Sequence, residues 1–227
     1  MTFPPPPVIM APKLFAEAIG TFVLVLTMGL ARVQLDVPAP LAVGMVLMAI
    51  VYAGYHISGA HYNPAVTVAV WLRGALPARE IAPYIGAQLV GALLASVFVQ
   101  YFNGFPIHLS PADGVTALKA LTGEAIVVFV LVYVILNVAA HPATASNHYY
   151  GLAIGGTVMG GSFAMSGITG GAFNPAVGLM PALFEILLGG VPTPMTWVYL
   201  VGPMLGGVGA ALAFKTMNPS PAVEPRS

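Results

Sequence analysis

The sequence predicts an all-α membrane protein with six transmembrane helices and two half-helices, arranged in two inverted repeats. The first observation is composition, because 58% of the residues are hydrophobic and only 6% are charged. A soluble domain has about 25% charged residues, so this chain cannot cover a surface that faces water. The second observation is a set of six long apolar segments. The third is a phrase, ISGAHYNPAV at 57–66, that recurs as ITGGAFNPAV at 168–177.

Six apolar segments are long enough to cross the hydrocarbon core, which takes about 20 residues in a helix. They are 14–33, 39–58, 83–102, 118–138, 149–167 and 195–214. Two further apolar stretches, 64–73 and 175–188, each follow an Asn-Pro-Ala triplet. These two are too short to cross alone, so we expect each to form a half-helix.

The two halves of the chain match in sequence. EAIGTFVLV begins at Glu17 and EAIVVFVLV at Glu124, with seven identities in nine positions. GAQLVG at 86–91 is similar to GPMLGG at 202–207. Each half therefore holds three spans, with a half-helix after the second. Because three is odd, the second half must enter the membrane upside down, an architecture found in transport proteins.

The distribution of lysine and arginine predicts the orientation, since cytoplasmic loops are enriched in both. If the N-terminus is inside, the outer side holds only Arg32 and Lys119. The inner side then holds Lys13, Arg73, Arg79, Lys215 and Arg226. This count favours cytoplasmic N- and C-termini.

The residue types of the two Asn-Pro-Ala triplets predict their structural role. Asparagine is a good N-cap and proline suits the first helical turn, so Asn63-Pro64-Ala65 and Asn174-Pro175-Ala176 each start a half-helix. Irregular backbone survives at membrane depth only where it is buried or lines a watery cavity. Inversion brings the two helix N-termini together, with their positive dipole ends. A neutral solute can form hydrogen bonds there, whereas a cation meets a positive potential.

With these features the chain resembles the major intrinsic protein family, the aquaporins and aquaglyceroporins. The resemblance covers 13–215 and rests on both Asn-Pro-Ala boxes, SGAHYNPAVT at 58–67, AEAIGTF at 16–22 and VGPMLGG at 201–207. It implies a passive channel for water and small uncharged solutes, assembled as a homotetramer with one pore per subunit. It also implies a ladder of backbone carbonyls along the pore: Gly59, Ala60, His61, Tyr62, Gly170, Gly171, Ala172 and Phe173.

The domain organisation follows from this resemblance. We expect a proline-rich tail at 1–12, a channel domain at 13–215 and a polar tail at 216–227. Within the channel domain the first repeat covers 13–102 and the second 118–215. The protein would be a multi-pass protein of the cell membrane, surrounded by lipid.

Glu17 and Glu124 each lie inside a predicted span, where a carboxylate is costly and by default indicates function. A proton relay is one interpretation. Their symmetric placement favours another, in which each carboxylate accepts hydrogen bonds from the backbone of a pore loop and anchors it. The family resemblance implies the same role.

The resemblance also places a selectivity filter at Val43, Ser162, Gly171 and Val177. Typical water channels have an aromatic residue, histidine and arginine among these positions, and glycerol channels have aromatics and arginine. This chain has none of them, so we expect a wider, apolar and uncharged ring with Ser162 as its only polar side chain. Glycerol, urea, ammonia and undissociated metalloid acids are the candidate solutes, and Val177→Arg should narrow the pore.

Several function classes are excluded or left as alternatives. Net charge is zero and basic runs are lacking, which argues against a nucleic-acid partner. No nucleophile, metal-ligand or phosphate-binding motif is present, so we expect neither enzyme activity nor a metal or cofactor. His141 and His148 allow pH gating, although a solvated loop is favoured. A coupled inverted-repeat transporter, an ion channel and a non-conducting structural membrane protein remain as alternatives. The absence of cysteine predicts insensitivity to mercury salts.

Overall fold

The computed structural model describes residues 10–33 and 38–219, which form eight α-helices and one short 3-10 helix. In chain order these are α1 (Met10–Ala31), α2 (Ala39–Ser58), α3 (Pro64–Arg73), α4 (Ala78–Asn103), α5 (Ala117–Val138), η1 (Pro142–Thr144), α6 (Tyr150–Thr169), α7 (Pro175–Leu187) and α8 (Val198–Met217). No strand occurs in these ranges. The predicted all-α fold class is confirmed.

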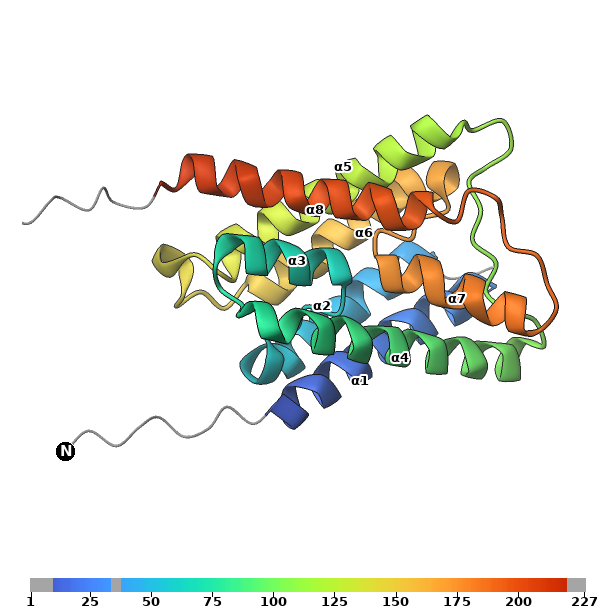
Figure 1. The fold of residues 1–227 in the computed structure, drawn as a ribbon, viewed down its shortest axis with the longest axis horizontal. Coiled ribbons are helices and arrows are strands. Elements are labelled where there is room, and N and C mark those ends of the chain that lie inside the picture. Colours follow the sequence, from blue (N-terminus) through green and yellow to red (C-terminus); the bar gives the residue numbers. More distant parts are fainter. Residues whose placement is uncertain (1–9, 34–37, 220–227) are drawn as a thin grey trace, which may run out of the picture.

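Six of the helices, α1, α2, α4, α5, α6 and α8, have the length and apolar composition of membrane spans. A helix of 20 residues is about 30 Å long, the thickness of the hydrocarbon core. The other two, α3 with 10 residues and α7 with 13, reach roughly halfway at about 1.5 Å per residue. Figure 1 shows α3 and α7 in line with each other between α8 and α4, one in each half of the molecule.

Helix pairing repeats between the two halves. α1 packs along α4 as α5 packs along α8, and α2 packs against α6 across the molecule. Each pairing depends on a glycine that lets two backbones approach. A Cβ atom on Gly91 would lie 2.2 Å from the carbonyl oxygen of Ala18, and one on Gly206 would lie 2.2 Å from that of Ala125.

These contacts correct the repeat alignment read from the sequence. Gly91 and Gly206 occupy equivalent places, whereas the similarity of GAQLVG and GPMLGG pairs Gly91 with Gly207. The third span of the first repeat, α4, therefore aligns with that of the second, α8, with a shift of one residue from the alignment expected from the sequence. The alignment was wrong because it matched glycines that do not have the same role in packing. Gly86 has open space around it, and a Cβ atom on Gly207 would lie 2.9 Å from the carbonyl oxygen of Ala65 in α3.

Some helix boundaries differ from those expected. α1 begins at Met10, within the expected tail, because Pro12 falls in the first turn, where backbone N–H groups have no helical partner anyway. α4 begins at Ala78 and continues through Pro83, since membrane helices tolerate proline when neighbouring groups satisfy the backbone. α8 ends at Met217, within the other expected tail. Residues 1–9 and 220–227 of the two tails lie outside the described residues.

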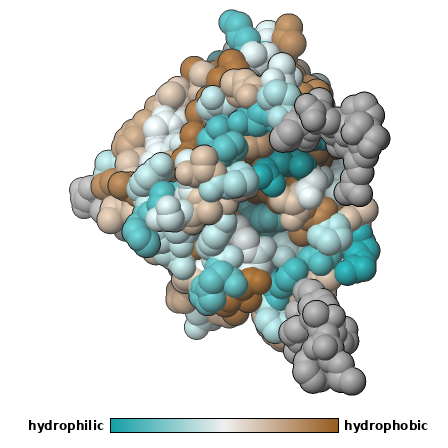
Figure 2. Space-filling view, turned by 90° about the vertical axis from the view of Figure 1, so that its left-hand side faces the viewer, coloured by the Kyte–Doolittle hydropathy of each residue, from teal (hydrophilic) through white to brown (hydrophobic). Residues whose placement is uncertain are grey.

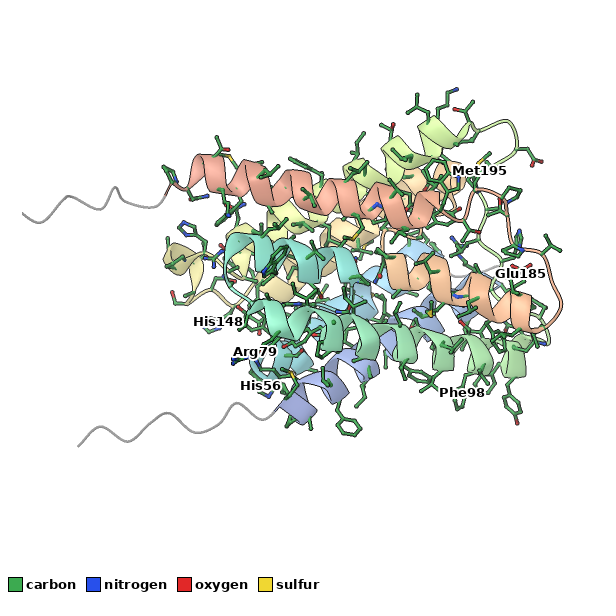
Figure 3. All side chains as sticks on the ribbon, in the orientation of Figure 1. His56, Arg79, Phe98, His148, Glu185 and Met195 are labelled. Atoms are coloured by element: carbon green, nitrogen blue, oxygen red, sulfur yellow. The ribbon has the colours of Figure 1, made fainter. Side chains whose placement is uncertain are left out.

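The outer surface suits contact with lipid along its length and with water at its ends. Large apolar side chains are exposed, among them Phe98, which points away from α4 in Figure 3. We call the end where α1 begins and α8 ends the terminal end; His56, Arg79 and His148 lie there, and Glu185 lies at the opposite end (Figure 3). Figure 2 views the terminal end and shows hydrophilic side chains gathered across its middle.

Candidate functional site

Two loops with the same unusual backbone lead into the half-helices. Three residues in each loop have φ angles between 50° and 92°. Residues other than glycine rarely adopt this left-handed conformation, which costs about 1–3 kcal/mol for each non-glycine residue held in it. The loops therefore need contacts from outside to keep their shape. The residues concerned are Gly59, Ala60 and Tyr62 in the first loop and Gly170, Gly171 and Phe173 in the second.

Glu17 of α1 contacts the first loop from behind. Its fully buried carboxylate accepts hydrogen bonds from the backbone N–H groups of His61 at 2.9 Å and Tyr62 at 2.7 Å. The Ser58 hydroxyl at 2.6 Å and the Gln88 amide at 2.7 Å also donate to it. Two carboxylate oxygens offer about four acceptor sites, so this carboxylate has as many donors as it can take.

Glu124 of α5 makes the equivalent contacts with the second loop. It is also fully buried, and it accepts from the backbone N–H groups of Ala172 at 3.2 Å and Phe173 at 2.6 Å. The Thr169 hydroxyl donates to it at 2.6 Å, as Ser58 does to Glu17. The inverted repeat therefore extends from the sequence to individual hydrogen bonds.

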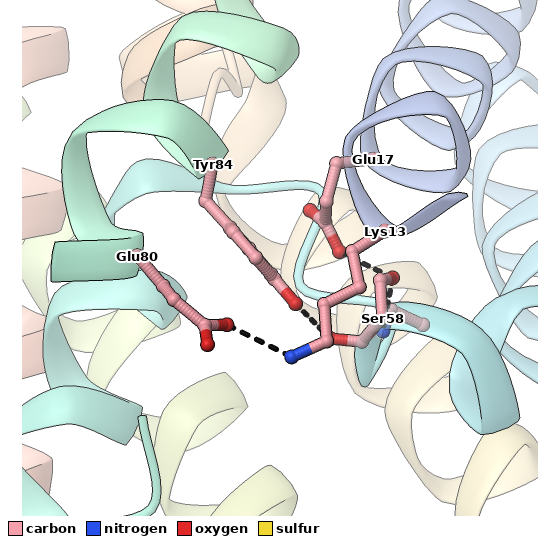
Figure 4. A network of polar contacts seen from close by, with 6 residues as sticks. Lys13, Glu17, Ser58, Glu80 and Tyr84 are labelled. Atoms are coloured by element: carbon pink, nitrogen blue, oxygen red, sulfur yellow. Dashed lines mark hydrogen bonds and ion pairs between the residues drawn. The ribbon is translucent and has the colours of Figure 1, made fainter. Parts of the chain in front are cut away.

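Two buried tyrosines complete this support, and sequence reasoning missed both. The Tyr84 hydroxyl donates to the carbonyl of Ser58 at 2.9 Å, and the Tyr199 hydroxyl donates to that of Thr169 at 2.7 Å. A tyrosine within a span resembles ordinary packing in sequence, and the one-residue alignment error hid this pair. Figure 4 shows the first network, with the Lys13–Glu80 ion pair beside it.

The two asparagines of the repeated triplets connect the halves at the centre. Each side-chain oxygen accepts from the N–H two residues on, that of Ala65 for Asn63 and that of Ala176 for Asn174, both at 2.9 Å. Each side-chain N–H₂ group crosses to the other loop, where Asn63 donates to the Phe173 carbonyl at 2.9 Å. Asn174 likewise donates to the Tyr62 carbonyl at 2.8 Å. The two half-helix N-termini therefore face each other.

A cavity of about 310 Å³ runs past both asparagines. All four residues of the expected filter line it, and so do the expected loop residues except Gly59 and Gly170. Most of the remaining lining is apolar: Leu24, Met28, Ala39, Pro40, Leu47, Val51, Val66, Leu131, Ile135, Ile154 and Val158. The arrangement provides a largely apolar passage with a few polar groups at its centre.

The orientation of the loop carbonyls follows from the glutamate bonds. In a trans peptide the C=O points opposite to the N–H of the next residue. The N–H groups that point at Glu17 and Glu124 therefore turn four carbonyls away from the carboxylates. These belong to Ala60, His61, Gly171 and Ala172, which all line the cavity.

Three other carbonyls of the expected ladder already have protein partners. Those of Tyr62 and Phe173 accept from the asparagines, and that of Gly170 accepts from the guanidinium of Arg32. Sequence reasoning missed the Gly170 contact, because it used Arg32 only as an orientation signal. Arg32 and Ser166 also line the cavity, although neither was expected there.

At the terminal end, hydrogen bonds connect the loop 139–149 to α2 and α3. The Tyr55 hydroxyl donates to the carbonyl of Ala139 and the Arg73 guanidinium to that of Ala140. The Tyr52 hydroxyl donates to the carbonyl of His148 at 2.9 Å. None of these loop residues lines the cavity described above.

The chain also matches a known protein family. Residues 7–214 match the family model described as Major intrinsic protein. Aquaporin NIP1-3 of Oryza sativa subsp. japonica is 35% identical over 219 residues, which cover 92% of this chain and 74% of that protein. Aquaporin NIP1-1 of Zea mays is 36% identical over 220 residues, which cover 91% of this chain and 74% of that protein.

A solved structure shares the fold. The X-ray structure of the aquaglyceroporin from Plasmodium falciparum superposes with a TM-score of 0.82, covering 93% of this chain and 98% of that one. Its sequence is only 23% identical to this chain, so this likeness supports the fold alone. It agrees with the arrangement of six spans and two half-helices.

Proposed function

We propose a pore, a solute class and a membrane setting for this chain, which belongs to the major intrinsic protein family by the match over residues 7–214. The chain is a multi-pass membrane protein and a passive channel for water and small solutes. Its family is one of channels, which points to a transporter without enzymatic chemistry. The proposal concerns the route through the protein and the solutes that take it.

The route is the cavity between the two half-helix N-termini. The observation that carries this proposal is that one cavity contacts both Asn63 and Asn174 and all four residues of the expected filter. The four loop carbonyls turned toward it supply acceptors. A primary amide has two N–H donors, so each asparagine can hold the opposite loop with one and offer the other to a solute.

Neutral solutes suit this route better than ions. An ion that leaves water for a largely apolar passage loses its hydration at a high free-energy cost, and a neutral molecule loses far less. The two facing helix N-termini add positive potential at the centre. A water or small polyol can exchange its hydrogen bonds with water for bonds to the loop carbonyls and the asparagine amides.

The filter of Val43, Ser162, Gly171 and Val177 admits solutes larger than water. Its side chains are small, and only Ser162 is polar among these four. We therefore include glycerol, urea, ammonia and undissociated metalloid acids among the solutes. Each is uncharged, and each can use the few polar groups that the cavity presents.

Glu17 and Glu124 act as loop anchors in this proposal rather than as a proton relay. Each accepts two hydrogen bonds from backbone N–H groups, and a backbone amide does not pass protons on. The bonds hold Tyr62 and Phe173 at positive φ. The carboxylates thereby fix the direction of the carbonyls that line the route.

The setting is a cell membrane with the terminal end in the cytoplasm. Lys13, Arg73, Arg79 and Lys215 belong to helix ends or loops at that end, and Arg32 and Lys119 are the only lysines or arginines of residues 10–33 and 38–219 that lie toward the other. That asymmetry follows the enrichment of cytoplasmic loops in lysine and arginine. The functional unit is a homotetramer with one pore in each subunit, in contact with lipid over the rest of its apolar surface.

Stopped-flow light scattering on proteoliposomes tests the proposal. The vesicles are shocked with sucrose or with glycerol and compared with empty vesicles. We expect fast shrinkage in sucrose, because water leaves through the pore and sucrose does not enter. In glycerol we expect fast shrinkage followed by fast reswelling, because glycerol then enters through the same pore.

The other outcomes are distinct. Fast shrinkage without reswelling would restrict the pore to water and overturn the assignment of the filter. Curves equal to those of empty vesicles would favour a non-conducting structural protein. Saturable uptake that depends on a proton or sodium gradient would instead indicate a coupled transporter.

A further inference from the structure

One cation lines the mouth of the cavity. Among the described lining residues, Arg32 is the only lysine, arginine, aspartate or glutamate. It directly follows α1, its side chain is exposed, and its guanidinium donates to the carbonyl of Gly170, 138 positions away in sequence. A residue from the first repeat therefore contacts the pore loop of the second.

The carbonyl that Arg32 contacts is held in place by its surroundings. Gly170 ends α6 in the left-handed conformation, and the preceding carbonyl, of Thr169, accepts from Tyr199 at 2.7 Å. A Cβ on Gly170 would lie 2.5 Å from the Tyr199 hydroxyl and 2.7 Å from the Ser110 carbonyl oxygen. Two residues further on, the loop is bound to Glu124. A fixed acceptor gives the guanidinium a defined position at the cavity mouth.

This feature breaks the symmetry of the repeats. The offset that relates Glu17 to Glu124 places Ala139 opposite Arg32. Ala139 carries no charge, and its carbonyl accepts from a neutral tyrosine hydroxyl, that of Tyr55. The loop support is shared by both halves, whereas a cation at the cavity is found on one side only. If Arg32 only held the loop in place, a neutral hydrogen-bond donor at the Gly170 carbonyl would be enough.

A guanidinium at this place has two physical effects. It is positively charged at every physiological pH and has five N–H donors, only one of which is needed for the bond to Gly170. The fixed charge repels cations that approach the mouth, and the donors attract the oxygen atoms of neutral solutes. Ser162, Ser166 and Gly171 line the same cavity, so Arg32 shares the lining with residues of the second repeat.

We propose that Arg32 is the selectivity residue of this channel, excluding cations at the outer mouth and donating hydrogen bonds to entering solutes. The inference rests on the proposed function and goes beyond it, because the filter of Val43, Ser162, Gly171 and Val177 has no charge of its own. In this chain the end of the first span supplies that charge to the loop of the second repeat.

Sodium uptake into proteoliposomes tests the inference. Vesicles hold a sodium-sensitive dye, with potassium and valinomycin to carry the compensating charge, and water permeability is measured on the same preparation. Arg32→Gln removes the charge but keeps a hydrogen-bond donor. Lys119→Gln is the matched control, since it removes the other outer cation from an exposed site that does not line the cavity.

We expect Arg32→Gln to raise the ratio of sodium uptake to water permeability, both measured on the same vesicles, by about tenfold or more, the scale of electrostatic effects on ion access. Lys119→Gln should behave as the wild type. The ratio of mutant to wild-type uptake should shrink in about 1 M salt, where the Debye length is about 3 Å. Adding Val177→Arg to Arg32→Gln should lower sodium uptake again, because it returns a cation to the same cavity.

An Arg32→Gln channel with normal water permeability and wild-type sodium uptake overturns the inference. If Arg32→Gln also loses water permeability, the variant Arg32→Lys distinguishes a role of the charge from a purely structural role. Restored water flow with low sodium uptake supports a role for the charge. Restored flow with high sodium uptake, or no restoration, makes Arg32 an anchor of Gly170 and rejects the inference. Absence of water permeability in the wild type would instead contradict the proposed function, and the inference with it.

Discussion

At the residue scale, the most consequential side chains are two carboxylates that never enter the pore. Glu17 and Glu124 are fully buried and do not line the cavity. They bind the backbone of loops whose residues include Tyr62 and Phe173 at positive φ. The free energy that offsets this strain comes from charge-assisted hydrogen bonds, which are about twice as strong as neutral ones. Their effect on transport is indirect, through the direction of the loop carbonyls.

The substitution Glu17→Gln should therefore destabilise the protein. Glutamine offers one oxygen in place of two, and its N–H₂ group faces the N–H donors of the loop. Leaving a buried donor without a partner costs about 1–3 kcal/mol, so we expect a lower midpoint of thermal unfolding in detergent. Asp113→Asn, at an exposed site, is the control. Unchanged stability combined with loss of pH-driven solute uptake would revive the proton-relay interpretation.

At the element scale, helices approach one another where glycines leave room. Gly91 of α4 faces the Ala18 carbonyl of α1, and Gly206 of α8 faces the Ala125 carbonyl of α5. Membrane helices associate mainly through such close packing, because lipid tails are as apolar as the helices. The spacing of glycines in the sequence shows which helices can pack closely, but not which glycine makes the contact.

Two glycines of the same helix give a direct test of this packing. Gly91→Ala should destabilise the protein by about 1–3 kcal/mol, the usual cost of overpacking, since its Cβ would meet a backbone oxygen at 2.2 Å. Gly86→Ala should be neutral or stabilising, because no atom lies within 4 Å of the added Cβ and alanine favours helices. Thermal unfolding of both variants in detergent makes the comparison. Equal effects would mean that the α1–α4 contact is looser than described.

The ion pair between Lys13 of α1 and Glu80 of α4 joins the same two helices at the terminal end. The Lys13 amino group lies 2.9 Å from the Glu80 carboxylate, whose side chain is only 3% exposed. Removing one partner of a buried pair costs about 3–5 kcal/mol, because the other charge is left without compensation. Lys13→Met should therefore destabilise more than the double variant Lys13→Met/Glu80→Gln.

Measuring the free energy of unfolding, or the thermal midpoint, for the two single variants and the double variant completes this thermodynamic cycle. The double variant should recover part of the loss. If it is as unstable as Lys13→Met or less stable, the pair does not tie α1 to α4 as the geometry indicates.

At the scale of the whole molecule, the proposed function sends water and solutes through the cavity that contacts both Asn63 and Asn174. The chain has no cysteine, so mercury salts should leave water permeability unchanged. Ser162→Cys adds a thiol to the cavity lining, and mercury binds thiolate strongly as a soft metal. We expect mercury to block most of the water flow through this variant, and a thiol reductant to reverse the block.

Thr216→Cys is the control for that experiment, since residue 216 is exposed near the end of α8 and does not line the cavity. Its permeability should resist mercury as the wild type does. Inhibition of Thr216→Cys but not of Ser162→Cys would show that water follows a route other than this cavity.

The sequence alone determined the fold class, the eight helices and the inverted repeat. These follow from local information, namely the length of apolar runs, the capping preference of Asn-Pro and the similarity of two segments. Helix ends were predicted less well from the sequence, since α4 begins at Ala78 and continues through Pro83. Whether a proline ends a membrane helix depends on neighbouring helices that satisfy the backbone, which local sequence does not encode.

Only the tertiary structure decided which residues meet at the cavity and behind the pore loops. The glutamates and asparagines could be singled out because the repeat marks them twice. Tyr84 and Tyr199 were hidden by a one-residue shift between the repeats, and Arg32 has no counterpart at Ala139. A contact across 138 positions leaves no periodic or local trace. It exists because α1 packs against α2 and α4, which in turn contact α6 and α7 of the second repeat, so that the end of one span reaches the loop of another.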